Sequence, residues 1–240
     1  MLNDTLALKR CLAALSDDLA ALSETFVVDG GRSSSVEEVC RAAGAAYVPS
    51  KPGRAVQMNS GAALARGTWL WFLHADCMPA VGSAQAIAEL NSKSDQPEWG
   101  CFAHRIDAAG LALRIIERTD NLRARWLRLP YGDQGIFVRR AVFEQLGGYA
   151  DAPILEDLML ARTLKRRGAP RVLSFVLKTD ARRWIRDGVM RTTATNWRVL
   201  WKFFVRGAPI EEIGAFYRRR TRRHDEAPHA HSAPMESAES

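Results

Sequence analysis

The sequence predicts an α/β fold with a mainly parallel sheet and helices on both faces. Short apolar segments alternate with helical patterns of ten or so residues along most of the chain. A length of 240 residues suits one large domain, or one domain with an appendage. In such sheets a ligand binds beyond the carboxyl ends of the strands. Polar residues at strand ends are therefore the first candidates for function.

The first half of the chain predicts strands and helices in alternation. An amphipathic helix over 5–23 precedes the strand TFVVD at 25–29, which ends in the turn GGRSSS. Gly44 and Gly67 each follow a helical pattern, where a helix stop is expected. The remaining elements predicted here are helices over 35–43, 53–67 and 81–92 and strands over 45–48 and 68–73.

The second half continues the alternation and adds a basic segment. We expect residues 1–180 to form the main domain, 181–224 to form basic, aromatic helices, and 225–240 to be a disordered tail poor in large apolar residues. The elements predicted within the main domain are strands over 99–106, 136–138 and 171–177, helices over 109–127, 140–146 and 156–167, and a loop, LPYGDQG, at 129–135.

Cysteine usage and hydropathy favour a cytoplasmic protein. The four cysteines are far apart and contain no C-x-x-C, which argues against a zinc site or a disulfide framework. The N-terminal segment does not resemble a signal peptide. No uncharged run approaches the roughly 18 residues that span a bilayer. We predict a cytoplasmic location, with peripheral attachment to the inner face of the membrane as an option.

The apolar strand before FLHADCMP ends in His74 and Asp76. Residues i and i+2 of an extended segment point to the same side, so these two side chains can converge on one point. An imidazole nitrogen and a carboxylate suit a borderline divalent ion such as Mn²⁺, with phosphate oxygens completing the shell. Spacing alone favours the alternative, in which Asp76 caps the turn before Pro79 and His74 bonds to backbone.

Acidic residues also mark two other element ends. Asp29 closes the strand TFVVD, and Glu156 and Asp157 open a helix after Pro153. Acids in a first helical turn are favoured by the helix dipole, so capping is one interpretation of the pair. The other is that three acidic ends of one α/β domain face a common cleft.

Four segments together resemble a known family. GRAVQMNSGAALARG, FLHADCMP, YGDQGIFVRRAVFEQLGGY and LEDLMLARTLKRRG, in this order, look like family-2 glycosyltransferases of the GT-A fold. The likeness is closest to a bacterial subgroup in which the Asp-x-Asp metal motif reads His-Ala-Asp, and it covers roughly residues 1–220. It implies the inverting transfer of a sugar from a nucleotide-sugar donor, assisted by Mn²⁺ or Mg²⁺, to an acceptor that is unknown and could be lipid-linked.

The resemblance implies roles for particular residues on the donor side. Asp29 matches the acid that contacts the nucleotide base, and Arg54 and Gln57 match a turn and helix beside the nucleotide. His74 and Asp76 match the metal motif that holds the donor diphosphate.

On the acceptor side, the resemblance makes Asp157 the general base, with Glu156 as its partner and Asp133 as a further catalytic candidate. The physics agrees, since an attacking hydroxyl must lose a proton and a carboxylate can accept it. The segment DARRW at 180–184 matches a Gln-x-x-Arg-Trp motif only in part. The residues implied near the acceptor are Gly132, Gln134, Arg183 and Trp184.

Two departures from the family pattern stand out. Family members begin with an apolar strand, a Pro and a Leu-Asn-Glu-like turn, whereas this sequence opens at MLND, so the first strand is missing. Either translation starts upstream of Met1, or the sheet and the donor site are altered. In addition, the turn DGGSTD of the family reads DGGRSSS, which replaces an acid and introduces Arg32.

The C-terminal segment carries the basic charge. Residues 181–225 contain 12 Lys and Arg against 4 Asp and Glu, a net +8. Trp197, Trp201 and Phe204 recur at helical spacing among arginines and a lysine. This stripe either packs on the core or lies on an anionic membrane surface with Trp at headgroup level. No nucleic-acid motif accompanies the run YRRRTRR at 217–223, so we predict no nucleic-acid partner.

Two other functions remain open from the sequence. A sugar nucleotidyltransferase shares the general sheet, but it needs a Gly-rich phosphate loop near the N-terminus, and MLNDTLALKR has none. A degenerate transferase would bind nucleotide or membrane without turnover, and the missing first strand is compatible with it.

Overall fold

The structure is a computed structural model that describes residues 4–222. The chain forms two compact units that divide between Val189 and Met190. The predicted tail at 225–240 lies outside the described residues.

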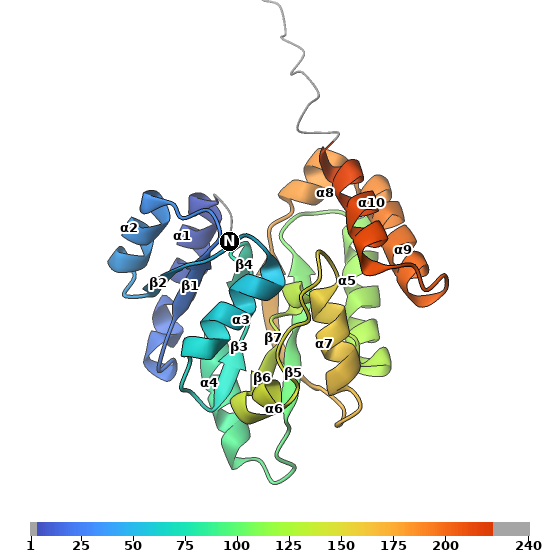
Figure 1. Cartoon of the computed structure of the whole chain (residues 1–240). Coiled ribbons are helices and arrows are strands. Elements are labelled where there is room, and N and C mark those ends of the chain that lie inside the picture. Colours follow the sequence, from blue (N-terminus) through green and yellow to red (C-terminus); the bar gives the residue numbers. More distant parts are fainter. Residues whose placement is uncertain (1–3, 223–240) are drawn as a thin grey trace, which may run out of the picture. The chain divides into compact units, whose positions relative to one another are not determined.

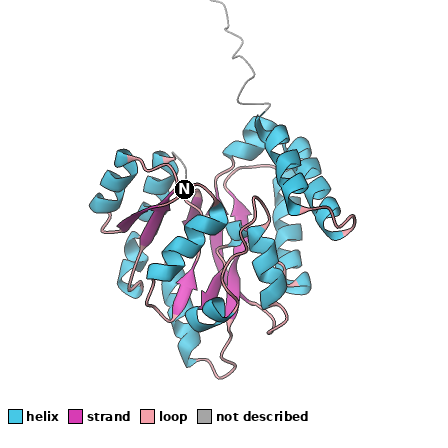
Figure 2. Ribbon diagram, in the orientation of Figure 1, coloured by secondary structure: helices cyan, strands magenta, loops and turns pink. Residues whose placement is uncertain are grey.

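A mixed five-stranded sheet forms the centre of the first unit (Figures 1 and 2). Only β5 and β7 are parallel; every other neighbouring pair is antiparallel. The prediction of a mainly parallel sheet is therefore wrong. The strand order is β3 (Trp69–Trp71), β6 (Phe137–Arg139), β5 (Trp99–Ile106), β7 (Arg171–Thr179) and β4 (Cys77–Pro79).

The connection from β5 to β6 explains the antiparallel pairing. It contains α5 (Leu111–Leu122), a π-helix η3 (Arg123–Leu127) and a 3₁₀ turn η4 (Gly132–Gln134). In η4 the Gln134 side chain donates a 3.4 Å hydrogen bond to the Phe102 carbonyl of β5. The chain then runs back toward the start of β5, where Phe137 pairs with Gly100. A helical crossover permits parallel pairing but does not require it, so the alternation of helices and strands does not by itself fix strand direction.

A small parallel sheet lies apart from the large one. It consists of β1 (Phe26–Asp29) and β2 (Ala46–Pro49), and among residues 4–222 no strand bridges the two sheets. Helices α1 (Thr5–Ala14) and α2 (Ser34–Ala42) supply the apolar side chains packed with it. That cluster includes Leu8, Leu12, Val27, Val36 and Cys40.

The core of the large sheet is aromatic. Phe102 and Phe137 are fully buried with Leu177, and the partly buried Trp69 and Trp71 pack against them. The helices of the first unit are mostly shorter than predicted, because 3₁₀ turns replace their last residues after α1 and α4. The remaining elements are η1 (Ser16–Ala21), α3 (Arg54–Leu64), α4 (Ser83–Ala88), η2 (Glu89–Ser92), α6 (Arg140–Gln145), α7 (Glu156–Leu164) and α8 (Arg182–Asp187).

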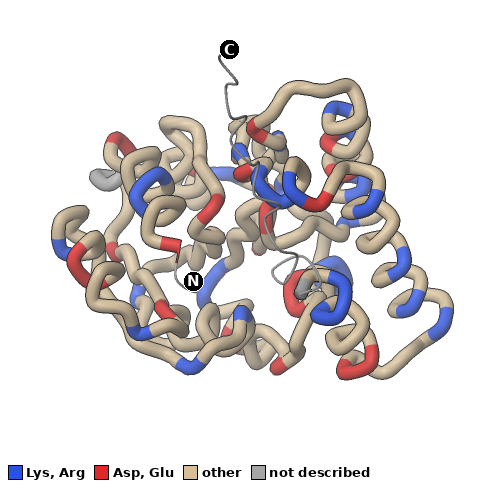
Figure 3. The backbone as a smooth tube through the Cα atoms, turned by 90° about the horizontal axis from the view of Figure 1, so that it is seen from above, with Lys and Arg blue, Asp and Glu red and all other residues tan. Residues whose placement is uncertain are grey.

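The second unit is a pair of helices, α9 (Val189–Phe204) and α10 (Ile210–Arg222). Lys202 joins them through a 2.7 Å ion pair with Glu212 and lies over the Phe216 ring. Figure 3 marks the Lys and Arg residues along the chain. Within the segment predicted to form basic, aromatic helices, 181–224, α8 and α9 are separated at Gly188, whose φ of +79° is left-handed. No helix in residues 4–222 is long and apolar enough to cross a membrane.

Candidate active site

The amino end of α7 meets the η4 turn. The backbone N–H of Gly132 donates a 2.6 Å hydrogen bond to Oδ2 of Asp157, and the Leu158 N–H donates a 2.6 Å bond to Oδ1. Leu155, just before the helix, has a left-handed φ of +64°, which is strained for a branched side chain. The carboxylate of Asp157 is thus fixed by backbone donors from two separate segments, and the local strain marks this helix start as a functional candidate.

Glu156 is buried beside Asp157. It is 1% exposed, and its Oε1 lies 3.5 Å from Nη1 of Arg54, the first residue of α3. Burial raises the pKa of Glu156, and the Asp157 charge adds to this, while the Arg54 guanidinium acts in the opposite direction. The structure therefore brings Glu156, Asp157 and Arg54 together, as expected of residues that share a site.

His74 also joins this group. A Cβ placed on Gly132 would lie 2.7 Å from Nε2 of His74 and 3.3 Å from Oδ2 of Asp157, so only glycine fits between them. Nε2 of His74 is buried and has no hydrogen-bond partner within residues 4–222. An unbonded imidazole nitrogen in a polar site is available as a donor atom for a ligand or a metal.

Asp76 presents an exposed carboxylate two residues after His74. Its backbone carbonyl accepts a 3.1 Å hydrogen bond from the Asp180 N–H, which ties the segment to the end of β7. Within the described chain, no group of three or more His, Cys, Asp and Glu residues is placed to hold a metal ion. His74 and Asp76 fit a metal only as two donors, with the rest of the coordination shell left to ligand oxygens.

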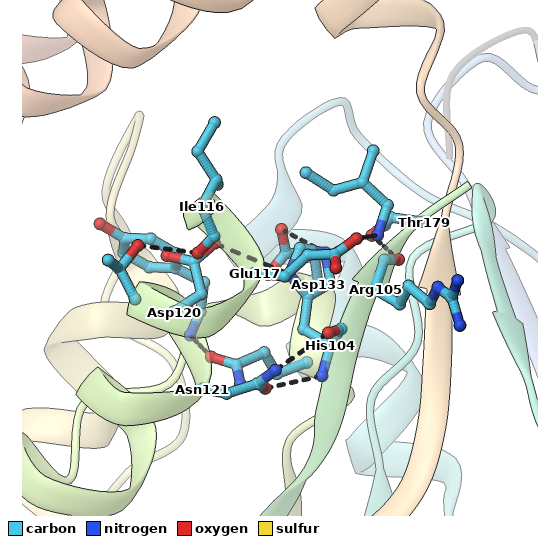
Figure 4. A network of polar contacts seen from close by, with 12 residues as sticks. His104, Arg105, Ile116, Glu117, Asp120, Asn121, Asp133 and Thr179 are labelled. Carbon is cyan, nitrogen blue, oxygen red and sulfur yellow. Dashed lines mark hydrogen bonds and ion pairs between the residues drawn. The ribbon is translucent and has the colours of Figure 1, made fainter. Parts of the chain in front are cut away.

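A buried histidine, His104, lies beside Asp133 in the centre of the large sheet (Figure 4). Nε2 of His104, on β5, lies 3.7 Å from Oδ2 of Asp133 and bonds to the Thr179 hydroxyl, while Nδ1 lies 3.6 Å from Oδ2 of Asp120. Burial by itself lowers the pKa of His104, but the Asp133 and Asp120 carboxylates outweigh it, so the pKa is raised. The ring is a candidate cation between two carboxylates.

His104 was not among the residues suggested by the sequence. It sits in the apolar strand WGCFAHRI, where a single histidine carries no spacing signal. Asn121 of α5 fixes its backbone, accepting from the His104 N–H at 2.8 Å and donating to its carbonyl at 3.1 Å.

Several predicted site residues bond to backbone in the structure. Asp29 is fully buried, and its two carboxylate oxygens accept 2.9 Å bonds from the N–H groups of Gly31 and Ser33. The Gln57 side chain donates a 2.9 Å bond to the Val28 carbonyl. These bonds shape the turn after β1, and the predicted nucleotide contacts of Asp29 and Gln57 stay predictions.

Two further predicted residues pack inside the first unit. Gln134 is fully buried and accepts a 3.2 Å bond from the Tyr131 N–H, so it holds the η4 turn. Trp184 packs against Ile106 and Leu113, and Arg183 precedes it on α8. Their roles toward an acceptor also stay predictions.

The geometry defines a class of protein. A mixed, curled sheet beside a small parallel sheet, with acidic residues at the strand and helix ends, is a GT-A-like fold. Residues 1–147 match the profile of glycosyl transferase family 2. The chain belongs to this family and is a family-2 glycosyltransferase.

Solved structures share the fold at low sequence identity. A mannosyltransferase, PcManGT from Pyrobaculum calidifontis, in complex with GDP-Man and Mn²⁺, is 12% identical with a TM-score of 0.56, over 95% of this chain and 74% of its own. Glucosyl-3-phosphoglycerate synthase from Mycobacterium tuberculosis, with phosphoglyceric acid, is 17% identical with a TM-score of 0.53, over 75% and 68%. S. aureus TarS 1–349 is 15% identical with a TM-score of 0.52, over 89% and 68%. No curated protein matches the sequence.

Proposed function

We propose that this enzyme transfers a sugar with inversion and that Asp157 is its general base. The observation that carries the proposal is the fixed Asp157 carboxylate, held by the Gly132 and Leu158 N–H groups at the start of α7. An acceptor hydroxyl oxygen bonds to the anomeric carbon as the bond from that carbon to the diphosphate breaks. The diphosphate leaves with the electron pair, and Asp157 takes the hydroxyl proton. Each oxygen of Asp157 keeps a second lone pair for this purpose.

On the donor side, the proposal assigns His74 and Asp76 to a divalent ion, Mn²⁺ or Mg²⁺. When bound, such an ion supplies positive charge to the leaving diphosphate. The buried, unbonded Nε2 of His74 and the exposed carboxylate of Asp76 support this assignment. The mannosyltransferase from Pyrobaculum calidifontis was solved with Mn²⁺ and GDP-Man, which makes the same kind of ligand reasonable here.

Arg54, Asp29 and Gln57 complete the proposed donor site. The Arg54 side chain is 56% exposed, so its guanidinium can reach a phosphate while Nη1 stays near Glu156. Asp29 ends β1 and Gln57 lies on α3, and their side chains bond to the backbone of Gly31 and Val28, at the turn after β1 and at its end. We assign them to the nucleotide end of the donor.

On the acceptor side, we propose that the acceptor is a lipid-linked sugar or alcohol. Gly132, Asp133 and Gln134 form η4 beside Asp157, and Arg183 and Trp184 lie on α8. In the second unit, Trp197 and Trp201 of α9 are exposed, whereas Thr192, Thr195 and Val199 are buried. This helix therefore shows its aromatic stripe outward, which favours docking of residues 184–223 on an anionic membrane. We place the protein in the cytoplasm, attached peripherally to the membrane.

The experiment is a screen of nucleotide sugars for hydrolysis and for transfer, followed by NMR of the first product. Inversion predicts a product whose anomeric configuration is opposite to that of the donor. A product with retained configuration would remove Asp157 as a simple base. Matching Asp157→Asn with Asp151→Asn, an exposed carboxylate on the loop before α7, separates a catalytic loss from a general charge effect.

A further inference from the structure

The outward face of α5 and η3 is unusually apolar for a surface helix. Trp126 is 79% exposed and Leu111 is 78% exposed. Ile115, Leu122 and Leu127 are more than half exposed as well. Exposed apolar residues scattered singly need no explanation, but a contiguous group of large ones marks an interaction site.

The spacing of these residues places them on one face. Leu111, Ile115, Leu122 and Trp126 follow each other at intervals of four, seven and four residues, which corresponds to one side of a helix. The opposite side packs into the core, because Leu113 and Ala124 are buried in the first unit. The segment therefore has a core face and a second apolar face that the fold does not require.

The charges on the outward face are all positive. Arg118, Arg125 and Arg128 are exposed, and none of them forms an ion pair within residues 4–222. The two acids of the same segment already form ion pairs with other arginines of that segment. Glu117 is buried and lies 2.8 Å from Arg114, and Asp120 lies 3.1 Å from Arg123.

We propose that this surface docks on an anionic lipid bilayer. The α5–η3 surface consists of Leu111, Ile115, Arg118, Leu122, Arg125, Trp126, Leu127 and Arg128. Aliphatic side chains and a tryptophan enter the headgroup and acyl boundary, and guanidinium groups pair with lipid phosphates. This combination of apolar groups with unpaired cations is complementary to an anionic interface.

A second copy of the chain fits this surface less well. Two-fold dimers place the same patch of each subunit against itself. The three unpaired arginines would then face three others without an acid on this surface to neutralise them, and like charges in contact are costly. The charge pattern therefore selects lipid over self-association.

Arg123, on the same segment but outside this surface, links α5–η3 to the η4 turn. The Arg123 guanidinium lies 3.3 Å from the Tyr131 ring centroid and donates a 2.8 Å bond to the Leu129 carbonyl. Gly132, which bonds to Asp157, follows Tyr131 directly. Docking through α5–η3 therefore holds the proposed acceptor side close to the lipid. The role of docking in bringing the acceptor side close to the lipid rests on the proposed function, whereas membrane docking itself does not.

The test is co-sedimentation of the full chain with vesicles of phosphatidylcholine alone or with phosphatidylglycerol added. We expect binding to the anionic vesicles that falls with salt. The triple variant Arg118→Gln, Arg125→Gln, Arg128→Gln should lower partitioning about tenfold or more, because each basic group near the surface adds affinity. Trp126→Gln should also weaken binding. Thermal unfolding checks the fold of each variant.

Matched controls make the outcome specific. The triple variant Arg41→Gln, Lys51→Gln, Arg66→Gln removes the same charge from exposed positions on other elements. It should partition like the wild type at moderate salt. Equal losses in both triples, wild-type binding by the α5–η3 triple, or no binding by the wild type would each overturn the proposal. So would a dimer that Trp126→Gln dissociates. None of these readouts needs donor or acceptor, so they are separate from failure of the proposed reaction.

Discussion

Gly132 and Asp157 are joined by a 2.6 Å hydrogen bond from a backbone N–H to a carboxylate oxygen, across 25 residues of sequence. This bond couples the loop on the acceptor side to the start of α7. Both the position of the proposed base and the shape of the loop depend on it.

Asp157→Asn should lower the rate of sugar transfer by about 10² to 10⁴, the range typical of a lost general base. An amide oxygen still accepts one of the two backbone bonds, so donor binding should persist and stability should fall only slightly. Steady-state kinetics and thermal unfolding measure the two effects. If the variant keeps more than about a tenth of the wild-type rate, the base is Glu156 or Asp133 instead.

Gly132→Ala should damage both stability and turnover. The new methyl group would sit 2.7 Å from Nε2 of His74, so the turn or the imidazole has to move. Overpacking of this kind costs about 1–3 kcal/mol. Gly168→Ala is the matched control, because a Cβ there meets nothing within 4 Å. Urea unfolding should separate the two variants. Equal stabilities would mean that the site accommodates the added methyl group without cost.

Asp76→Ala should remove the metal-dependent part of nucleoside diphosphate binding. The substitution takes away one of the two protein donors while its exposed position leaves the fold intact. Calorimetry with UDP or GDP, with and without Mn²⁺, measures the effect. Asp151→Ala serves as the control. Unchanged Mn²⁺-dependent binding in Asp76→Ala would contradict the metal assignment.

His104 should make stability depend on pH above neutrality. Its pKa in the folded state is raised, so its charged form contributes stability below the ordinary histidine pKa of about 6.5, and this contribution is lost as the pH rises through the folded-state pKa. The difference in free energy of unfolding between the wild type and His104→Gln should therefore shrink as the pH rises above about 6.5. A difference that stays constant over this range would show that folding does not raise the pKa of His104.

Glu156→Gln should stabilise the protein at neutral pH and lower its activity. The raised pKa of Glu156 means that its ionised form is disfavoured in the folded state, so the penalty is present at pH values above that pKa. The gain from Gln should disappear as the pH falls toward the ordinary glutamate pKa of about 4.3. Denaturant titrations at several pH values measure it. Destabilisation at neutral pH would indicate that the Arg54 pair outweighs the cost of burial.

The sequence was sufficient to place most strands and helices, because apolar segments and glycine stops are local signals. It could not give the direction of β6, which depends on where η4 contacts β5 through Gln134. It also missed β4, a strand of three residues that is defined only by pairing Cys77–Pro79 with β7.

For the site as well, residues in sequence motifs could be predicted, whereas residues that only the fold brings together could not. Glu156 and Asp157 could be proposed as site residues because they lie in LEDLMLARTLKRRG, one of the segments that resemble the family. His104 was missed because its partners, Asp120, Asp133 and Thr179, come from three distant segments. The bonds of Asp29 to two backbone N–H groups also show that one polar residue can hold a turn, whatever ligand it meets.

The separation of the two sheets has a consequence for cooperativity. A two-stranded sheet has little stability of its own, so β1 and β2 depend on the helices packed against them. Amide hydrogens in Phe26–Asp29 should therefore exchange with solvent faster than those in the centre of β5, through a partial opening that leaves the large sheet intact. Because Asp29 ends β1, this opening would dismantle the nucleotide end of the proposed donor site. A bound donor would then stabilise the small sheet, and it would slow amide hydrogen exchange in β1 more than in β5.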